Sequence, residues 1–190
     1  YAEIKDMLAD EAQYYTLCYK KMGLIGVDTF EAKELPVFND IFKNCNTWTS
    51  KKKMEDFFTA HGFDSLHILH NNHYAFEQYG ICGTRGWVSM QGEAADAKIL
   101  AREVQRLAVS IESAVKAGLE PIVFLHYPPI YGSSMNYEIL EVLHQYHIQK
   151  CYYGHVHGKG HHFAFQGRYE ETEMRLISSD YLQFIPELVL

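Results

Sequence analysis

Hydrophobic residues recur at helical intervals along much of the chain. Between residues 93 and 118, apolar side chains are spaced by three and four positions, charged residues fill the other face, and Gly118 stands where a helix C-terminal cap belongs. Shorter patterns of the same kind cover residues 1–22, 51–61 and 137–147. The sequence therefore predicts four amphipathic helices.

Short apolar runs bounded by turn residues alternate with these helices. We expect strands at residues 65–69, 79–82, 121–125 and 150–153. Residues 163–190 indicate two or three further strands, joined by Gly167-Arg168 and by Ser178-Ser179-Asp180. The alternation of strands and helices predicts a layered α/β architecture.

Length and composition indicate a single domain spanning residues 1–190. A chain of 190 residues that is 47% hydrophobic and 14% aromatic can bury one sizeable core. The net charge of −7, with acidic and basic residues mixed, argues against nucleic acid as a partner. The apolar runs are far shorter than the roughly 20 residues that cross a bilayer. We expect no membrane partner and a cytoplasmic location.

The four cysteines, Cys18, Cys45, Cys82 and Cys151, lie far apart and form no Cys-x-x-Cys pair. This pattern favours reduced thiols over a disulfide framework.

Two predicted strands end in histidines. His126 follows the strand at 121–125, and His155 and His157 follow the strand at 150–153 in a Gly-His-x-His-Gly turn. Ligands of open α/β sheets gather at the carboxyl ends of the strands, and imidazole binds Zn, Fe and Mn. A lone His-x-His is more often a solvated turn than a metal site. Its combination with a His-x-Pro-Pro strand end about 29 residues earlier favours metal ligands.

Four stretches together carry a family resemblance. They are Gly83-Thr84-Arg85-Gly86-Trp87, His126-Tyr127-Pro128-Pro129, Tyr153-Gly154-His155-Val156-His157-Gly158 and Ser178-Ser179-Asp180-Tyr181-Leu182. Through them, over roughly residues 48 to 190, the chain resembles the calcineurin-like metallophosphoesterases, and more closely a bacterial branch of predicted phosphohydrolases.

The resemblance implies a fold, a cofactor and a reaction. The family fold is an αββα sandwich whose strand-end loops hold two divalent metals drawn from Mn, Fe and Zn. By resemblance, His126 and His155 would ligate one metal and His157 the other. Two such ions clamp a phosphate and activate a water that attacks phosphorus. The implied substrate is a small-molecule phosphate ester.

The amino-terminal motifs of the family are missing or degenerate. Residues 1–43 contain neither its Asp-x-His nor its Gly-Asp, so we expect a sandwich that is incomplete on this side, with a divergent segment 1–43 and a recognisable region 44–190. Where relatives carry Gly-Asn-His-Asp, Asn44 of this chain matches a metal ligand, whereas Cys45 replaces a proton-donating histidine and Asn46 replaces an acid. A thiol is a poor substitute for imidazole in general acid catalysis, and we interpret Cys45 as a small buried residue.

Charge limits the number of metals. Three neutral imidazoles and one amide supply no negative charge, so two divalent cations would repel each other almost uncompensated. We therefore expect fewer metals than a full dinuclear centre, with a single weak site on His126, His155 and one more donor as the leading arrangement. Three protein ligands plus water are sufficient for catalytic zinc.

Other polar residues allow two interpretations each, one functional and one structural. Arg85 would bind a phosphate as a catalytic residue, or stack on Trp87 for structural reasons. Asp180 would orient a ligand histidine, although a turn-forming aspartate is the preferred interpretation. His161 and His162 would support the metal ligands, although solvated strand histidines are preferred.

Two functions remain open. One is a metal-dependent phosphoesterase, in an impaired form. The other is a catalytically inactive or truncated relative that acts as a binding or structural protein. Loss of two sandwich strands would expose a sheet edge and an apolar patch, which we expect the amino-terminal helix or a second copy of the chain, as a homodimer, to cover.

Overall fold

The computed structural model describes residues 51–63, 67–87, 94–185 and 187–189. The chain divides into two units, Tyr1–Ile68 and Leu69–Leu190, and each is described by itself. In the first unit, helix α3 spans Lys51–Ala60 and confirms the helix predicted at 51–61. The helix predicted at 1–22 lies outside the described residues, and the single-domain organisation stays a prediction.

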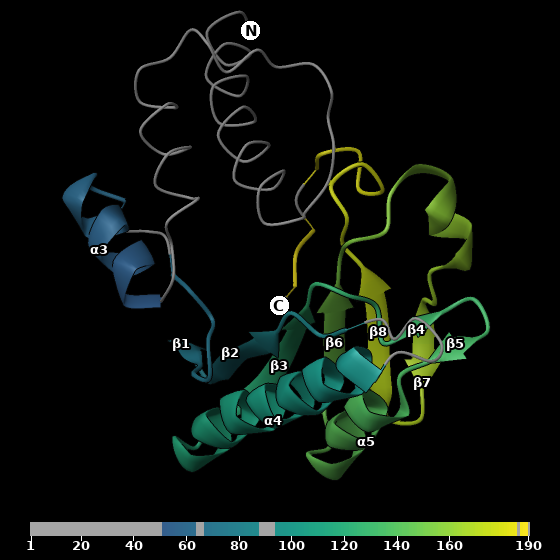
Figure 1. Cartoon of the computed structure of the whole chain (residues 1–190), viewed down its shortest axis with the longest axis horizontal. Helices are drawn as coiled ribbons and strands as arrows, with labels where there is room; N and C mark the ends of the chain where they lie inside the picture. Colours follow the sequence, from purple (N-terminus) through teal and green to yellow (C-terminus); the bar gives the residue numbers. More distant parts are fainter. Residues whose placement is uncertain (1–50, 64–66, 88–93, 186, 190) are drawn as a thin grey trace, which may run out of the picture. The chain divides into compact units, whose positions relative to one another are not determined.

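Six strands form one mixed sheet in the second unit (Figure 1), in the order β1-β2-β3-β6-β8-β7. Their bounds are β1 Tyr74–Phe76, β2 Tyr79–Thr84, β3 Glu120–Leu125, β6 Lys150–Tyr153, β7 Gly167–Tyr169 and β8 Thr172–Leu176. The central strands β2, β3, β6 and β8 are parallel, whereas β1 and β7 run antiparallel at the two edges. The fold is therefore mixed α/β, as the sequence predicts.

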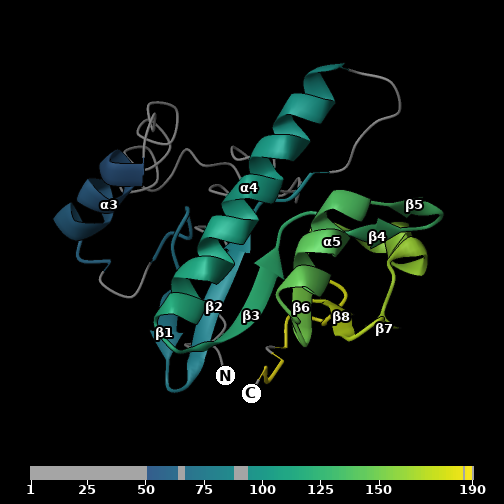
Figure 2. The same cartoon turned by 90° about the horizontal axis from the view of Figure 1, so that it is seen from below.

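Two helices connect the parallel strands. Helix α4, Ala94–Lys116, links β2 to β3, and helix α5, Tyr137–Gln145, links β3 to β6. Both crossovers advance in the same direction across the sheet, and right-handed crossovers of this kind put their helices on the same face. Figure 2 shows α4 and α5 side by side, and the Tyr146 hydroxyl, just after α5, donates to Glu112 Oε1 of α4 at 2.7 Å.

The core lies between the sheet and these two helices. A row of inward-facing residues crosses the four parallel strands and is exposed by 1% or less: Cys82, Val123, Cys151 and Met174. Helix α4 contributes Leu107, Ile111 and Ala114, which are fully buried. Helix α4 approaches β2 so closely that a Cβ at Gly80 would lie 2.4 Å from Ala114 Cβ, so only glycine fits there.

Burial raises the pKa of the Cys82 thiol to about 11 and that of Cys151 to about 12, and both cysteines are free.

The opposite face of the sheet carries the end of the chain. The Tyr152 hydroxyl and Lys150 Nζ both donate to the carbonyl oxygen of Val189, at 3.3 and 3.0 Å. The Tyr152 ring also stacks on Phe124 of the neighbouring strand, with 5.2 Å between ring centroids.

Some sequence predictions need correction. Residues 67–69 form no strand, so the prediction at 65–69 is wrong in its described part. The turn between β7 and β8 lies at Glu170-Glu171, with φ of 52° at Glu170, and Gly167-Arg168 starts a strand instead of ending one. Glutamate rarely adopts a positive φ, so the residue types Glu170-Glu171 did not indicate a turn.

The helices predicted at 93–118 and 137–147 and the strands at 79–82, 121–125 and 150–153 are confirmed. Two features were not predicted from the sequence. One is the edge strand β1, and the other is a small hairpin, β4 Ile130–Tyr131 with β5 Ser134–Met135. Of the helices in the described part of the chain, none combines the length and apolarity that a membrane crossing needs.

The packing of α4 predicts a matched pair of stability changes. Leu107→Ala empties a fully buried position and should lower the free energy of unfolding by about 2–5 kcal/mol. Val109→Ala, on the same helix at 40% exposure, should change it by less than about 0.5 kcal/mol. Urea denaturation measures both, and equal losses in the two variants would contradict the described face of α4.

Candidate functional site

The candidate site lies where the four parallel strands end. Their last shared row is Thr84, Leu125, Tyr153 and Leu176, paired strand to strand. Directly beyond this row come Arg85 after β2, His126 after β3, His155 and His157 after β6, and Asp180 after β8. Parallel pairing therefore brings residues from four distant parts of the chain to one edge of the sheet.

His126 and His155 face each other, as the sequence analysis expects of two metal ligands. Nδ1 of His155 lies 3.0 Å from Nε2 of His126, and their ring centroids are 4.8 Å apart. Two imidazole nitrogens bound to one tetrahedral zinc at about 2.0–2.1 Å would lie about 3.4 Å apart. The observed spacing is therefore only a few tenths of an ångström from that of two ligands on one ion.

Backbone strain positions His155. Its φ is +70°, and the Val156 N–H donates to the Gly154 carbonyl across it at 2.9 Å. A hydrogen bond between residues i and i+2 around a positive φ is the rare, strained form of the γ-turn. A non-glycine residue in this region costs on the order of 1–3 kcal/mol and is found where function requires the geometry. The strain lies at the residue whose ring meets His126.

Burial favours the neutral form of both rings of this pair. Burial, and then the positive charges of His155, Arg85 and His157, lower the pKa of His126 to about 4. Burial and His157 also lower the pKa of His155. A neutral imidazole offers the lone pair that a metal ion needs.

Tyr127 packs against the pair from one side. Its ring centroid lies 4.3 Å from that of His155, 4.7 Å from that of His126 and 5.7 Å from that of Trp87. Its backbone N–H donates to the Arg85 carbonyl at 2.9 Å, which joins the loops after β2 and β3. The ring therefore shields the histidines and limits their rotation.

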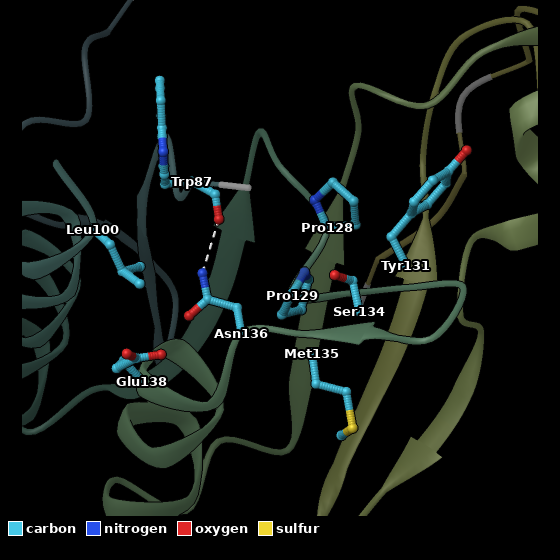
Figure 3. A pocket seen from close by; sticks show the side chains of 9 residues that line it. All are labelled: Trp87, Leu100, Pro128, Pro129, Tyr131, Ser134, Met135, Asn136 and Glu138. Carbon is cyan, nitrogen blue, oxygen red and sulfur yellow. Dashed lines mark hydrogen bonds between the residues drawn. The ribbon is translucent and has the colours of Figure 1, made fainter. Parts of the chain in front are cut away.

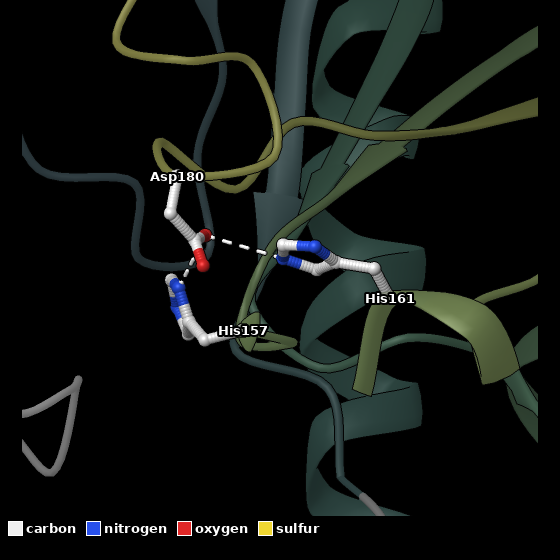
Figure 4. Close-up of side chains that lie close together, drawn as sticks. All are labelled: His157, His161 and Asp180. Carbon is white, nitrogen blue, oxygen red and sulfur yellow. Dashed lines mark hydrogen bonds and ion pairs between the residues drawn. The ribbon is translucent and has the colours of Figure 1, made fainter. Parts of the chain in front are cut away.

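His157, His161 and Asp180 form a second cluster (Figure 4). Asp180 Oδ1 lies 2.7 Å from His157 Nδ1 and 3.3 Å from His161 Nε2. One donor atom from each residue lies within 4.8 Å of the others, so this cluster could hold a metal ion. All three side chains are partly buried.

Asp180 is fixed as a carboxylate. Burial alone would raise its pKa, but hydrogen bonds from the Gly158 N–H at 2.9 Å and from His157, with the charges of His157 and His161, lower the pKa below its ordinary value. With Nδ1 of His157 directed at Asp180, its Nε2 is buried and has no hydrogen-bond partner among the described residues. A buried acceptor without a partner is costly, so this nitrogen is suited to an additional ligand.

The predicted metal ligands fall into two groups. His126 lies with His155, whereas His157 lies with His161 and Asp180; in the described part of the chain, the latter cluster is the one place where three such donors come together. His157 remains close enough for its charge to act on both members of the pair. Asn44, the fourth predicted ligand, lies outside the described residues, as do Cys45 and Asn46.

Arg85 sits over Trp87, with Cζ 4.7 Å from the ring centroid, and its Nη2 lies 3.8 Å from Glu103 Oε1. Its side chain is 47% exposed, so most of its five N–H donors remain free to bind an anion. Stacking on Trp87 is thus observed, and it leaves the phosphate-binding interpretation open.

A hollow of about 240 Å³ lies beside the His126 strand end (Figure 3). It is lined by Trp87, Leu100, Pro128, Pro129, Tyr131, Ser134, Met135, Asn136 and Glu138. The Asn136 side chain caps α5 by accepting from the Ile139 N–H at 3.1 Å and also donates to the Trp87 carbonyl at 2.8 Å. The hydrogen bond from Asn136 to Trp87 therefore connects the lining of the hollow to the loop that carries Arg85.

One preferred interpretation of the sequence is wrong: His161 is not a solvated strand residue, because it lies half-buried in the 3₁₀ helix Gly158–Phe163. Asp180 lies in a turn, as expected, and its carboxylate also holds His157. His162, in the same helix, is exposed, as expected of a solvated residue.

The sequence analysis also missed Tyr127 and Glu103. Glu103 is 0% exposed on α4. An acid within the apolar stripe Leu100, Leu107 and Ile111, at helical spacing, was the available signal. Tyr127 carried no separate signal, because its role depends on rings from two other strands.

Comparisons of the chain with protein-family models, with curated proteins and with solved structures give no match.

The lowered pKa of His126 predicts how stability depends on pH. Between pH 6.5 and about 4 the unfolded chain binds a proton at His126 that the folded chain does not, so the free energy of unfolding should fall as the pH falls through this window. His126→Asn should flatten that slope. Urea denaturation from pH 7 to 4.5, with a chelator present, measures it, and the control is the exposed His162→Asn. A wild-type slope unchanged in His126→Asn would exclude a buried neutral His126.

Proposed function

We propose that this protein is a metal-dependent phosphoesterase that hydrolyses small-molecule phosphate esters. The observation that carries the proposal is the convergence of His126 and His155 at 3.0 Å, beside His157 held by Asp180. These residues come from three parallel strand ends, and the turn after β6 shows two features with a structural cost, a positive φ at His155 and an unpartnered nitrogen on His157. The resemblance to calcineurin-like metallophosphoesterases assigns the same three histidines to metal.

The donors suit a divalent ion such as Mn, Fe or Zn. His126 and His155 offer neutral nitrogens at nearly the spacing that one ion requires. Asp180 accepts from Nδ1 of His157, which is how carboxylates orient metal-binding histidines, and this leaves Nε2 of His157 available to a ligand. One ion is favoured over two, because Asp180 is the one carboxylate in contact with the described histidines of the site. His126 and His155 offer this ion a pair of donors, and His157, His161 and Asp180 are the three described donors that lie within 4.8 Å of one another.

The residues of the chain divide the catalytic work. A divalent ion bound here supplies Lewis acidity and lowers the pKa of a bound water. Arg85 binds the phosphate oxygens through its free N–H donors, and Tyr127 keeps water from one side of the histidines. The hollow lined by Trp87, Pro128 and Met135 receives the organic part of the ester.

The finer fold assignment belongs to this proposal. The described sheet with α4 and α5 on one face corresponds to half of an αββα sandwich. Its other face is covered by the chain's own carboxyl-terminal segment near Tyr152, and a second copy of the chain is proposed to cover the remainder. A cytoplasmic enzyme with no nucleic-acid or membrane partner fits the acidic net charge of −7.

A second candidate function is an inactive relative that binds its ligand without turnover. The observation in its favour is the scarcity of carboxylates at the histidines, since phosphoesterases of this type use acids to hold two metals. Metal content and turnover separate the two candidates.

Loading and turnover test the main proposal. Chelator-treated protein reloaded with Mn, Fe or Zn should hydrolyse an aryl phosphate, and His155→Ala should reduce kcat/KM by at least about 100-fold, because it removes one of the two paired histidine ligands. The control is His162→Ala, a neighbouring exposed histidine. Metal binding without turnover in any of the three forms would favour the inactive relative instead.

Variants of Asp180 and His161 distinguish the two ways in which the donors can hold an ion. If Asp180 acts by orienting His157, Asp180→Asn should weaken metal affinity about 10–100-fold, while His161→Gln should weaken it less than about threefold. Titration calorimetry of chelator-treated protein with zinc measures both. Equal losses in the two variants would place the ion in the cluster of His157, His161 and Asp180.

A further inference from the structure

A second hollow, of about 320 Å³, opens at the β2 end of the same sheet edge. It is lined by Leu69, His70, Asn71, Gly83, Thr84, Arg85, Arg102, Glu103 and Arg106. Three arginines thus surround one carboxylate, which leaves a surplus of two positive charges in a chain whose net charge is −7. We name this hollow the arginine pocket.

Glu103 organises the pocket without neutralising it. Its side chain is 1% exposed; Oε2 accepts from Thr84 Oγ1 at 2.5 Å, and Oε1 accepts from Arg106 Nη1 at 2.8 Å. Arg85 Nη2 lies 3.8 Å from Oε1. Each guanidinium carries five N–H donors, so one carboxylate satisfies a small part of what the two arginines offer.

Arg102 provides charge that the fold does not use. It is exposed, and among the described residues it forms no hydrogen bond or ion pair. It lies four positions before Arg106 on α4, and like charges at this spacing destabilise a helix. Two arginines on one helix face, a third from the β2 loop and a buried acid that fixes two of them together form a site built for an anion with several oxygens.

The position of the pocket relates it to the histidines. Arg85 both lines the pocket and lies near enough to His126 for its charge to lower the pKa of that ring. Adjacent strands are about 4.8 Å apart, so β2 lies roughly 10 Å from β6, which carries His155 and His157. A phosphate at the histidines and an anion in the arginine pocket are therefore separate groups, at about the spacing of the two phosphates of a sugar bisphosphate.

We infer that the arginine pocket binds a second phosphate group, so that the natural substrate is a bis-phosphorylated small molecule with its scissile phosphate at the histidines. The inference rests on the proposed function for the role of the histidines. The pocket itself is independent of metal, because its donors are guanidinium and amide groups. Binding in the pocket can therefore be measured where hydrolysis cannot occur.

The test is to titrate inorganic phosphate into chelator-treated protein and to measure the heat of binding by calorimetry. A Trp48→Phe background leaves Trp87 as the one tryptophan of the chain, and its fluorescence should change on binding because Arg85 stacks on it at 4.7 Å. We expect saturable binding that weakens with salt. Arg102→Gln should weaken it about tenfold, the effect of losing a charge-assisted hydrogen bond, and Arg168→Gln, an exposed arginine on β7, should leave it unchanged.

The outcomes separate this inference from the proposed function. Absence of saturable binding, or equal affinity in Arg102→Gln and wild type, would overturn the arginine pocket even if the metal-loaded enzyme is active. Loss of binding in His155→Ala would place the phosphate at the histidines and would also overturn it. Binding that depends on Arg102 in a protein without turnover would retain the pocket and reject the phosphoesterase. In an active enzyme, Arg102→Gln should raise KM for a sugar bisphosphate more than for an aryl phosphate.

Discussion

Parallel pairing of four strands is the constraint on which the rest of this structure depends. The backbone hydrogen bonds that align Thr84, Leu125, Tyr153 and Leu176 fix the heights at which the strands end. The next residues of each strand therefore emerge at one edge, although almost a hundred positions separate the first from the last. Helices α4 and α5 bury one face of the sheet and hold this register, because a slip by one residue would turn the buried row of Cys82 and Val123 outward.

Charge is distributed unevenly along that edge. Arg85 and two arginines of α4 make the β2 end positive, while Asp180 supplies a carboxylate at the β8 end. Between them stand His126 and His155, which burial keeps neutral. In the function we propose, the neutral donor pair would hold a cation and the positive pocket would attract an anionic substrate, with the limited negative charge favouring one ion over two.

Local strain and ring packing complete the site. The positive φ at His155 has a cost in conformational energy, and the packed core beneath the strand ends supplies the stability that tolerates it. Tyr127 touches both histidine rings and Trp87, so the loops after β2, β3 and β6 form one connected unit. A substitution in any one of these loops should be felt by the others, because their side chains share contacts.

The sequence by itself determined the long helices, the central strands and the positions of the histidines at strand ends, because periodicity and turn residues act locally. That the strands before His126 and His155 are parallel neighbours was decided by the tertiary structure. Only the tertiary structure decided that His157 is held by Asp180, that His161 joins them from a 3₁₀ helix, and that Glu103 gathers Arg85 and Arg106 into a pocket. Apart from Glu103 and Arg106, which lie three positions apart on α4, these contacts join residues from different elements, up to 23 positions apart. Their geometry follows from side-chain rotamers and burial that no local pattern encodes.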